Sequence, residues 1–462
     1  MTFYEAASPY CSTNSSICFI NYLSNFSTAL YFKNPVNDMI NKKNILLRDS
    51  HRWMVFSLIS LIYLFVYFHR VSTSVIAQDI LKAFNVNATA LGFMSSMYFY
   101  LYAFEQPLVG YFSDIFGPRR VIAYCTLAAA CGCFIFALSP DIAWASAGRA
   151  LIGIGVGGVY VPAVKAFSQW FERNDFSTMI GLLIAVGNFG AVIATTPLAW
   201  AANNWGWRIS FHIIGWISLA LAMGAFFLIK DFDGSVETVK DENILEPAGT
   251  GSKKIPFYMA LISFQFWILA VVFFGVYGIV ITFQGLWATP YLMAVLETDR
   301  IAASRLNMLI PMGFIVGAPL FGRLSDRIFK SKVHVISWLL ALLTLSWAGI
   351  LFGMELGILS VFLILFFMGI ATGGFVSTFW AHIREIIPAG ILGSVSGLLN
   401  PAPFLGVAVF QVLTGSLIDR GRLIDGAYLP GAYKSSFMLC FLVSGACFII
   451  SFFLKENKPE EK

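Results

Sequence analysis

The chain has 462 residues, of which 58% are hydrophobic and 12% are charged, and its formal net charge is +5 at pH 7. Soluble domains carry about 25% charged residues, so this composition excludes an ordinary globular protein. Its apolar runs are far longer than the strands of a barrel, and the chain is therefore predicted to be an all-α, polytopic membrane protein. The Lys and Arg residues are spread over loops and termini, which argues against a nucleic-acid partner.

Residues 1–50 are polar and irregular and are predicted to form a cytoplasmic extension. Their one apolar patch, at 17–32, is interrupted by Asn and Ser residues. It therefore fits neither a signal peptide nor a membrane span. Met39 opens a short basic leader directly before the first span, and both Met1 and Met39 stay open as the start of the native chain.

Twelve long apolar runs follow. A crossing of the bilayer hydrocarbon, which is about 30 Å thick, takes roughly 20 apolar residues. The first six runs are predicted to form one bundle within 51–230 and the last six a second bundle within 256–455, with a cytoplasmic linker at 231–255 and a charged tail at 456–462. The predicted spans cover residues 53–76, 88–112, 121–138, 142–170, 177–201, 209–229, 258–290, 302–321, 333–352, 356–381, 390–417 and 433–454.

The charges of the short loops predict the orientation. Arg and Lys residues are concentrated in the loops on the side that also carries both termini, for example Arg119, Arg120 and Arg323. Because cytoplasmic loops carry an excess of positive charge, this side is predicted to be cytoplasmic. A bacterial inner membrane is the expected location.

The two predicted bundles share an internal repeat. The glycine pattern of span four recurs in span ten, and part of the loop after span two recurs after span eight. Repetition at a nearly constant offset indicates an internal duplication, so the six-helix bundles are predicted to be pseudo-symmetric. The matching positions are Gly153, Gly157 and Gly158 with Gly369, Gly373 and Gly374, and Gly110 and Asp114 with Gly322 and Asp326.

Span one contains Arg70, which lies about 25 Å along its helix from the start of the run. The side chain is interpreted as an anchor for a substrate carboxylate or phosphate, because a guanidinium group binds both with paired hydrogen bonds. The alternative is a charge that extends to the outer end of the span and marks its boundary.

Three further ionisable side chains lie within spans, where such groups are rare and by default functional. Glu105 in span two is predicted to carry a coupling proton, with Arg149 in span four as a second coupling residue. Lys165 in span four is predicted to assist substrate binding. Two alternatives stay open: a salt bridge from Glu105 to a neighbouring helix, for instance to Lys165, and extension of Arg149 to the outer surface.

Polar and aromatic side chains of other spans complete the predicted substrate site. None is specific alone, because aromatic residues in spans pack more often than they bind. They are Asn188 in span five, Gln284 and Trp287 in span seven, Trp380 in span ten and Asn400 in span eleven.

The loop after span two reads Gly110-Tyr-Phe-Ser-Asp114-Ile-Phe-Gly117-Pro118-Arg119-Arg120. Gly110 permits close helix approach, Asp114 places a carboxylate at the membrane boundary, and the Gly-Pro pair turns the chain. With these residues the chain resembles the major facilitator superfamily, whose cytoplasmic loop signature they match.

That resemblance implies a latch between the two halves on the cytoplasmic side, formed by the carboxylate and bases of this loop. The second, degenerate copy lacks the Gly-Pro turn and contributes Asp326 and Arg327. The alternative is that Arg119 and Arg120 only set the topology.

Within the superfamily, the first half resembles the organophosphate:phosphate antiporters and sugar-phosphate permeases. The resemblance implies binding roles for Arg70, Lys165 and Asn188. Members of that branch carry a second phosphate-binding Arg in span seven, whereas this sequence has only apolar residues there, around Ile281. A carboxylate or a zwitterion therefore fits one Arg and one Glu better than a phosphate dianion does.

Together these features predict a secondary active transporter that takes up a small anionic or zwitterionic metabolite with a proton, as a monomer working by alternating access. The expected partners are the small-molecule substrate, the proton and the lipid bilayer. Efflux of a hydrophobic or siderophore-like compound and a transporter-like ligand sensor stay open as alternatives. The sequence contains no phosphate loop, metal box or nucleophile elbow, so no enzyme activity, cofactor or metal is expected.

Overall fold

The computed structural model describes residues 35–230, 263–329, 331–353, 357–387, 389–424 and 426–456. The chain divides into two units, Met1–Met54 and Val55–Lys462, and the account below concerns the second. In the first unit the described backbone is helical from Pro35, so residues 35–50 are not irregular as the sequence suggested. The linker predicted at 231–255 lies outside the described residues.

The first half of the second unit consists of helices that follow one another along the chain. Spans four and five are each built from two helices, which break at Gly158–Val159 and at Ala194–Thr195, the latter directly before Pro197. The helices are α2 (Pro35–Phe84), α3 (Ala88–Phe116), α4 (Pro118–Leu138), α5 (Ile142–Gly157), α6 (Tyr160–Trp170), α7 (Arg173–Ile193), α8 (Thr196–Trp205) and α9 (Trp207–Leu228).

The second half repeats this plan and adds a short antiparallel hairpin. Span seven contains a π-helical turn, η1 (Phe283–Trp287), between α11 (Phe264–Thr282) and α12 (Ala288–Leu296). The remaining elements are α13 (Arg300–Asn307), α14 (Leu309–Arg327), α15 (Lys332–Phe352), α16 (Ile358–Ile386), α17 (Ala389–Leu399), α18 (Pro401–Ile418), β1 (Leu423–Ile424), β2 (Ala427–Tyr428) and α19 (Pro430–Ser451).

Every predicted span corresponds to a helix of the described chain. Eleven helical stretches are long and apolar enough to cross a bilayer, and α3, with 29 residues, covers the twelfth predicted span. The expected all-α fold with twelve spans is therefore confirmed. Within the described residues the pairing of β1 with β2 is the only sheet.

Several spans are longer than predicted, among them spans one and seven. The helix of span one continues past residue 76 to Phe84 although Asp79 and Lys82 follow. In this added part of the helix, Asp79 Oδ1 lies 2.6 Å from Arg300 Nη2 of α13. Span seven runs past residue 290 to Leu296 through the π turn. Such turns occur frequently at functional sites.

The repeated glycines have equivalent places in the two halves. Gly153 of α5 lies against the backbone of Tyr98 in α3, and Gly369 of α16 lies against the backbone of Ile310 in α14. A Cβ at either position would overlap with the facing carbonyl oxygen, so only Gly permits this approach. Span four thus packs on span two as span ten packs on span eight, which is what the predicted pseudo-symmetry requires.

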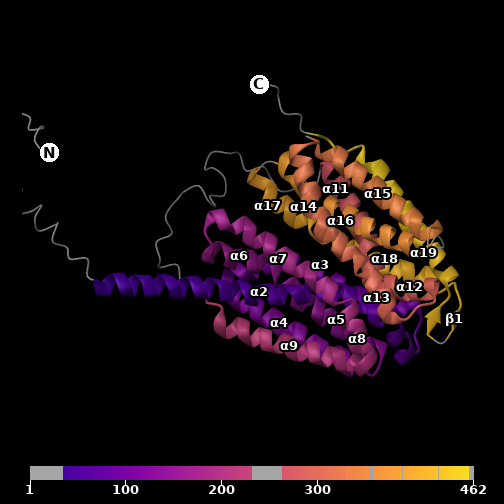
Figure 1. Cartoon of the computed structure of the whole chain (residues 1–462), viewed down its shortest axis with the longest axis horizontal. Coiled ribbons are helices and arrows are strands. Elements are labelled where there is room, and N and C mark those ends of the chain that lie inside the picture. Colours follow the sequence, from indigo (N-terminus) through magenta and orange to yellow (C-terminus); the bar gives the residue numbers. More distant parts are fainter. Residues whose placement is uncertain are drawn as a thin grey trace, which may run out of the picture. The chain divides into compact units, whose positions relative to one another are not determined.

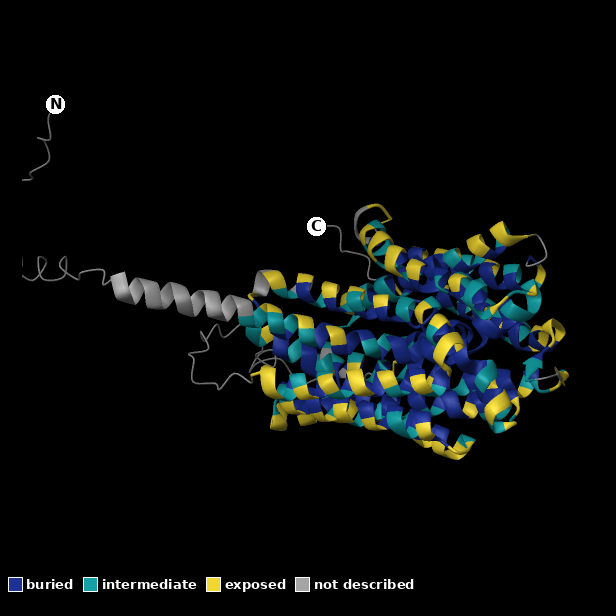
Figure 2. Cartoon of the chain, turned by 60° about the horizontal axis from the view of Figure 1, so that its bottom comes forward, coloured by how far each residue is buried: buried dark blue, intermediate teal, exposed yellow. Residues whose placement is uncertain are grey.

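In Figure 1 the helices of the first half, coloured indigo to magenta, lie beside those of the second half, coloured orange to yellow. Buried residues fill the space between the helices (Figure 2), and large exposed apolar residues such as Trp216 and Trp338 cover the surface. This distribution suits a surface that faces lipid rather than water.

The Val55–Lys462 unit has two ends, which differ in the connections that they carry. The hairpin end carries the end of α2, the start of α3 and the β1–β2 hairpin, and lies near the label β1 in Figure 1. The linker end carries the end of α9 and the start of α11, between which the segment 229–263 runs.

Candidate functional site

Arg70 of α2 is buried where the two halves meet, with 5% of its surface exposed. Its Nη2 donates a hydrogen bond to the hydroxyl of Tyr102 in α3 at 3.2 Å, and its Nη1 donates to the hydroxyl of Tyr277 in α11 at 3.1 Å. The guanidinium carbon also lies 4.4 Å from the ring centre of Tyr67 and 5.1 Å from that of Phe404 in α18, within the range of cation–π attraction. Arg70 therefore contacts both halves at once.

Close helix packing holds Arg70 at this position. Gly285 in the π turn lies against the backbone carbonyl of Arg70, where a Cβ would overlap with the oxygen. One turn further along α2, Ser74 Oγ donates to Thr289 Oγ1 at 3.1 Å and accepts from the Thr289 amide at 3.0 Å. Span one and span seven are thus joined at Arg70, and the alternative that Arg70 extends to the end of its span is wrong.

Among the described residues, no carboxylate forms an ion pair with the positive charge of Arg70. Its Nε has no hydrogen-bond partner within the same part of the chain. A buried charge without a counter-charge is costly. Because its present partners are neutral, the guanidinium can still donate two parallel hydrogen bonds to a bound carboxylate. The site is therefore suited to an anion.

Glu105 of α3 is a second buried charge, and its Oε1 has no hydrogen-bond partner among the described residues. It lies against Gly157 at the end of α5, where any Cβ would overlap with the carboxyl group. The next residue, Gln106, donates from Nε2 to the Gly157 carbonyl at 3.4 Å and accepts from Asn400 Nδ2 at 3.0 Å. Glu105 thus adjoins a hydrogen bond that connects the halves.

Lys165 of α6 does not pair with Glu105. Its Nζ lies 2.6 Å from Asp114 Oδ1 and donates to the Ser113 carbonyl at 3.0 Å. Asp114 follows Glu105 by nine residues on α3, which is roughly 14 Å along the helix and on its opposite face. The alternative of a Glu105–Lys165 salt bridge is therefore wrong, and Lys165 lies at the linker end rather than beside Arg70.

Arg149 of α5 is fully buried inside the first half, with 0% of its surface exposed. Its Nη2 donates to the backbone carbonyl of His69 at 3.1 Å, and its guanidinium carbon lies 5.0 Å from the ring centre of Tyr98. The alternative that Arg149 extends to the outer surface is therefore wrong. Arg149 supports the helix that carries Arg70, and its role in proton coupling stays a prediction.

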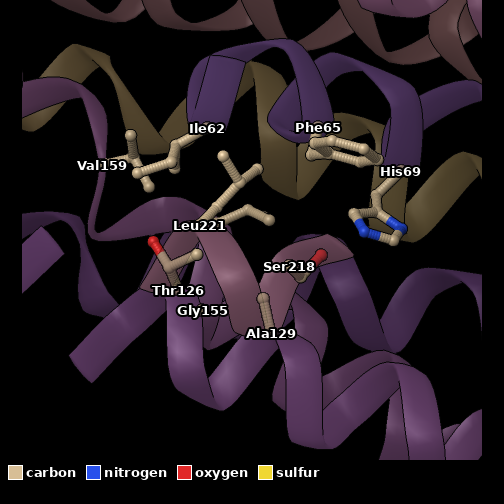
Figure 3. Close-up of a pocket in the computed structure, with 10 residues that line it drawn as sticks. Ile62, Phe65, His69, Thr126, Ala129, Gly155, Val159, Ser218 and Leu221 are labelled. Atoms are coloured by element: carbon tan, nitrogen blue, oxygen red, sulfur yellow. The ribbon is translucent and has the colours of Figure 1, made fainter. Parts of the chain in front are cut away.

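The ring of His69 lines a small pocket of the first half (Figure 3). Its Nε2 lies 3.7 Å from Cys133 Sγ. The pocket measures about 10 Å³ and is lined mainly by apolar side chains, among them Ile62, Phe65 and Leu221. This is the space of about one water molecule, so the pocket is too small for a metabolite and does not compete with Arg70 as a substrate site.

The other predicted site residues have local partners. Asn188 Nδ2 donates to the Ile184 carbonyl of its own helix at 3.0 Å, and Trp287 Nε1 donates to Thr414 Oγ1 at 2.8 Å. The backbone carbonyl of Gln284 accepts from Asn307 Nδ2 at 3.1 Å. These contacts hold helices together, and the binding roles of Asn188, Gln284 and Trp287 stay predictions.

Trp380 of α16 lies closer to the Arg70 site. Its ring packs edge-on against Phe273 at 5.9 Å between centres, and Phe273 packs against Tyr277 at the same distance, 5.9 Å. Since Tyr277 accepts from Arg70, one ring separates Trp380 from a partner of the guanidinium. Its predicted place near the substrate site is thus consistent with the packing.

At the linker end, the predicted latch has its recorded contacts within the first half. Asp114 pairs with Lys165 of the same half, and Arg119 Nε donates to the Phe226 carbonyl of α9 at 2.6 Å. Gly117 has a φ of 81° and Pro118 begins α4, as the predicted Gly-Pro turn requires. Gly110 and exposed Arg120 complete the motif, whereas the side chains of Asp326 and Arg327 lie outside the described residues. An interdomain latch stays a prediction.

The hairpin end is where charged groups join the halves. The carboxylate of Asp419, at the end of α18, accepts from the backbone amides of Ala88 and Thr89 at 2.7 and 2.9 Å, and from the hydroxyls of Thr89 and Tyr428. An acid at a helix N-terminus satisfies free amides and the helix dipole. Burial and the bond to Asp419 raise the pKa of Tyr428 well above its usual range, so this hydroxyl stays a donor at neutral pH.

Sequence reasoning missed Asp419 and the tyrosines that surround Arg70. Tyr98 and Tyr102 are four residues apart on one face of α3. A Tyr hydroxyl in a span needs a partner, so this spacing was an available signal. Asp419 gave no such signal, because its partners in the first half, the amides of Ala88 and Thr89, lie about 330 positions away in the sequence.

Two related helical halves that cross a membrane, with a buried polar site between them, are typical of membrane transporters that work by alternating access. The sequence model of the Major Facilitator Superfamily matches residues 59–410, and the chain belongs to this superfamily. It is a secondary transporter and not an enzyme.

Known proteins of similar sequence agree with this assignment. A probable sulfoacetate transporter of Cupriavidus necator is 24% identical over 435 residues, which cover 90% of this chain and 97% of the relative. A hexuronate transporter of Bacillus subtilis is 25% identical over 382 residues, covering 79% and 87%. A solved bacterial homolog of the human lysosomal transporter Spinster, inward-facing and unoccupied, matches with a TM-score of 0.72 at 18% identity, covering 87% and 97%. The last likeness concerns the fold.

Proposed function

We propose that the chain takes up a small organic anion together with a proton, and that Arg70 binds the carboxylate group of this anion. The observation that carries the proposal is the unpaired guanidinium of Arg70 between the two halves. The named substrates of both relatives, sulfoacetate and hexuronate, are organic anions. An exporter of hydrophobic compounds would have no use for an unpaired buried cation.

The hydrogen bonds of Arg70 suggest how an anion affects the two halves. Nη2 is bound to Tyr102 of the first half and Nη1 to Tyr277 of the second. A carboxylate that accepts from both nitrogens competes with both hydroxyls. Binding thus replaces contacts to each half and favours a different arrangement of the halves, as alternating access requires.

Glu105 is proposed as the proton carrier. A carboxylate with an unpaired oxygen is costly in this buried place, and a bound proton removes the charge. Because Gln106 follows Glu105 and contacts both Gly157 and Asn400, a change at the carboxyl group is transmitted to a bond between the halves. Protonation of Glu105 is in this way coupled to the contact between the two halves.

The orientation is proposed from the charges of the loops, with the linker end cytoplasmic and the hairpin end outside. In that orientation, the contacts of Asp419 close the outer end. The arrangement of the halves is then inward-facing.

Reconstituted protein tests the proposal. We expect Arg70→Gln to abolish both uptake and counterflow of radiolabelled D-glucuronate in proteoliposomes. Glu105→Gln should abolish accumulation driven by a pH gradient while it preserves counterflow, because exchange needs no net proton movement. Arg422→Gln is the matched control, since Arg422 is exposed. Counterflow that survives Arg70→Gln contradicts the anion site, and accumulation that survives Glu105→Gln contradicts the proton carrier.

A further inference from the structure

Three neutral side chains on the hairpin-end side of Arg70 are buried with unpaired polar atoms. They are Thr73 of α2, Ser95 of α3 and Gln411 of α18, each at most 1% exposed. Among the described residues, neither hydroxyl oxygen has a hydrogen-bond partner, and neither does the amide oxygen or the amide nitrogen of Gln411. Buried polar groups are nearly always paired, so a group without a partner at this site needs an explanation.

Helical register places these side chains on the faces that line the Arg70 site. Ser95 precedes Tyr102 by seven residues, and Gln411 follows Phe404 by seven. Seven residues are about two helical turns, roughly 10 Å, and return to nearly the same face. Thr73 follows Arg70 by three residues and lies about one turn above it.

The helices that carry these residues are in direct contact. The rings of Tyr102 and Phe404 are 4.3 Å apart between centres, and Gly92 of α3 lies against the backbone of Gln411. Helices α3 and α18 therefore run side by side (Figure 1), from Arg70 up to the level of Gln411. By register, the three unpaired groups lie within about two helical turns of the Arg70 site on its hairpin-end side, and they are called the neutral polar layer below.

The chemistry of this layer differs from that of Arg70. It offers hydroxyls and one amide, which can donate and accept but carry no charge. One cation lies near this layer: the guanidinium carbon of Arg149 is 5.0 Å from the ring centre of Tyr98, but the side chain is enclosed within the first half and donates to the His69 carbonyl. Further toward the hairpin end, Asp79 and Arg300 are paired with each other at 2.6 Å. The layer itself offers partners to the hydroxyl groups of a substrate.

We propose that Thr73, Ser95 and Gln411 form a subsite for the hydroxyl groups of a substrate whose carboxylate is bound by Arg70. This proposal rests on the proposed function and narrows it to polyhydroxylated carboxylic acids. The hairpin end closes over the subsite at Gly415 and Asp419. A substrate that enters from this end meets the hydroxyl partners before it meets Arg70.

Two probes that share a carboxylate and a six-membered ring test the subsite, D-glucuronate with hydroxyls and cyclohexanecarboxylate without them. Binding to the purified full-length protein is measured by titration calorimetry. We expect Ser95→Ala and Gln411→Leu each to weaken D-glucuronate binding about tenfold, the worth of one or two buried hydrogen bonds. Cyclohexanecarboxylate binding should not change.

Ser96→Ala is the matched control, because the neighbouring Ser96 is equally buried but its Oγ already donates to the Phe93 carbonyl at 2.7 Å. If Gln411→Leu does not fold, Ser95→Ala and Thr73→Val decide. Unchanged D-glucuronate affinity in these variants overturns the subsite, and so does equal weakening of both probes or a wild-type protein that does not prefer D-glucuronate. Arg70→Gln should weaken both probes; if it weakens neither, the proposed function fails and not the subsite alone.

Discussion

The two ends of the interface between the halves differ in how their charges are used. At the hairpin end, Asp419 and the Asp79–Arg300 pair join the first half to the second. At the linker end, Asp114 pairs with Lys165 within the first half, and Lys332 pairs with Glu385 within the second. The glycines follow the same division: Gly92 and Gly415 lie against facing backbone, whereas a Cβ at Gly110 would meet no atom within 4 Å.

This contrast shows which end is closed. Charges that bridge the halves, with backbones in contact, stabilise closure at the hairpin end. At the linker end, the Asp114–Lys165 and Lys332–Glu385 pairs each lie within one half, so separation of the halves need not break either of these two pairs. Since closure must alternate between the ends during transport, groups at the hairpin end should affect transport more strongly than their counterparts at the linker end.

The largest effect is expected for Gly92→Ile. The new side chain would occupy the space of the Gln411 backbone, and overpacking typically costs about 1–3 kcal/mol, so transport should fall by about 5- to 150-fold. The matched variant at the other end is Gly110→Ala, which has room for its methyl group and gains helix propensity. Counterflow and thermal unfolding of the two purified variants give the comparison. Equal loss of stability in both would show that the ends do not differ as described.

Asp419→Ala should have the next largest effect. The amides of Ala88 and Thr89 lose their acceptor, and loss of such a cap costs about 1–2 kcal/mol. Hydrogen exchange in the peptide 85–92 should accelerate by about tenfold. Ser416→Ala is the control on the same helix, because its exposed hydroxyl donates only to the Leu413 carbonyl. Exchange that stays unchanged in Asp419→Ala would contradict a bridging role for this carboxylate.

A smaller effect is expected at the second bridge. Arg300 and Asp79 are 14% and 24% exposed in their side chains, so the pair should contribute about 1 kcal/mol or less. Reversal of either charge should slow counterflow about fivefold. The double variant Asp79→Arg with Arg300→Asp should recover most of the rate. If the double variant is as slow as the single ones, the two charges do not act through each other.

Much of the fold could be predicted from the sequence because it depends on local signals. Apolar runs gave the spans, and the recurring glycines gave the relation between the halves, which the packing of Gly153 and Gly369 reproduces. Arg70 was found in the same way, because a charge inside a span stands out without knowledge of its partners. The continuation of α2 to Phe84 was not predicted, because the charged residues Asp79 and Lys82 end the apolar run, and the partner of Asp79, Arg300, lies far along the chain.

The partners within the site could not be predicted, since they depend on which helix faces meet. Arg70 binds hydroxyls that are 32 and 207 positions away in the sequence. The sequence allowed Lys165 to pair with Glu105 or with Asp114, both on α3. Only the packing of α6 on α3 decides between these opposite faces in favour of Asp114.

The smallest effect is expected for Asp114→Asn at the linker end. Its pair with Lys165 is exposed, with 75% of the Asp114 side chain and 32% of the Lys165 side chain accessible. Exposed pairs contribute about 0–1 kcal/mol and are screened by salt, so the free energy of unfolding should change by less than about 1 kcal/mol. Thermal unfolding at low and high salt measures this, and the small difference should vanish at high salt. A loss that is larger and independent of salt would mean that Asp114 already holds the halves together in this arrangement, and the contrast between the two ends would be lost.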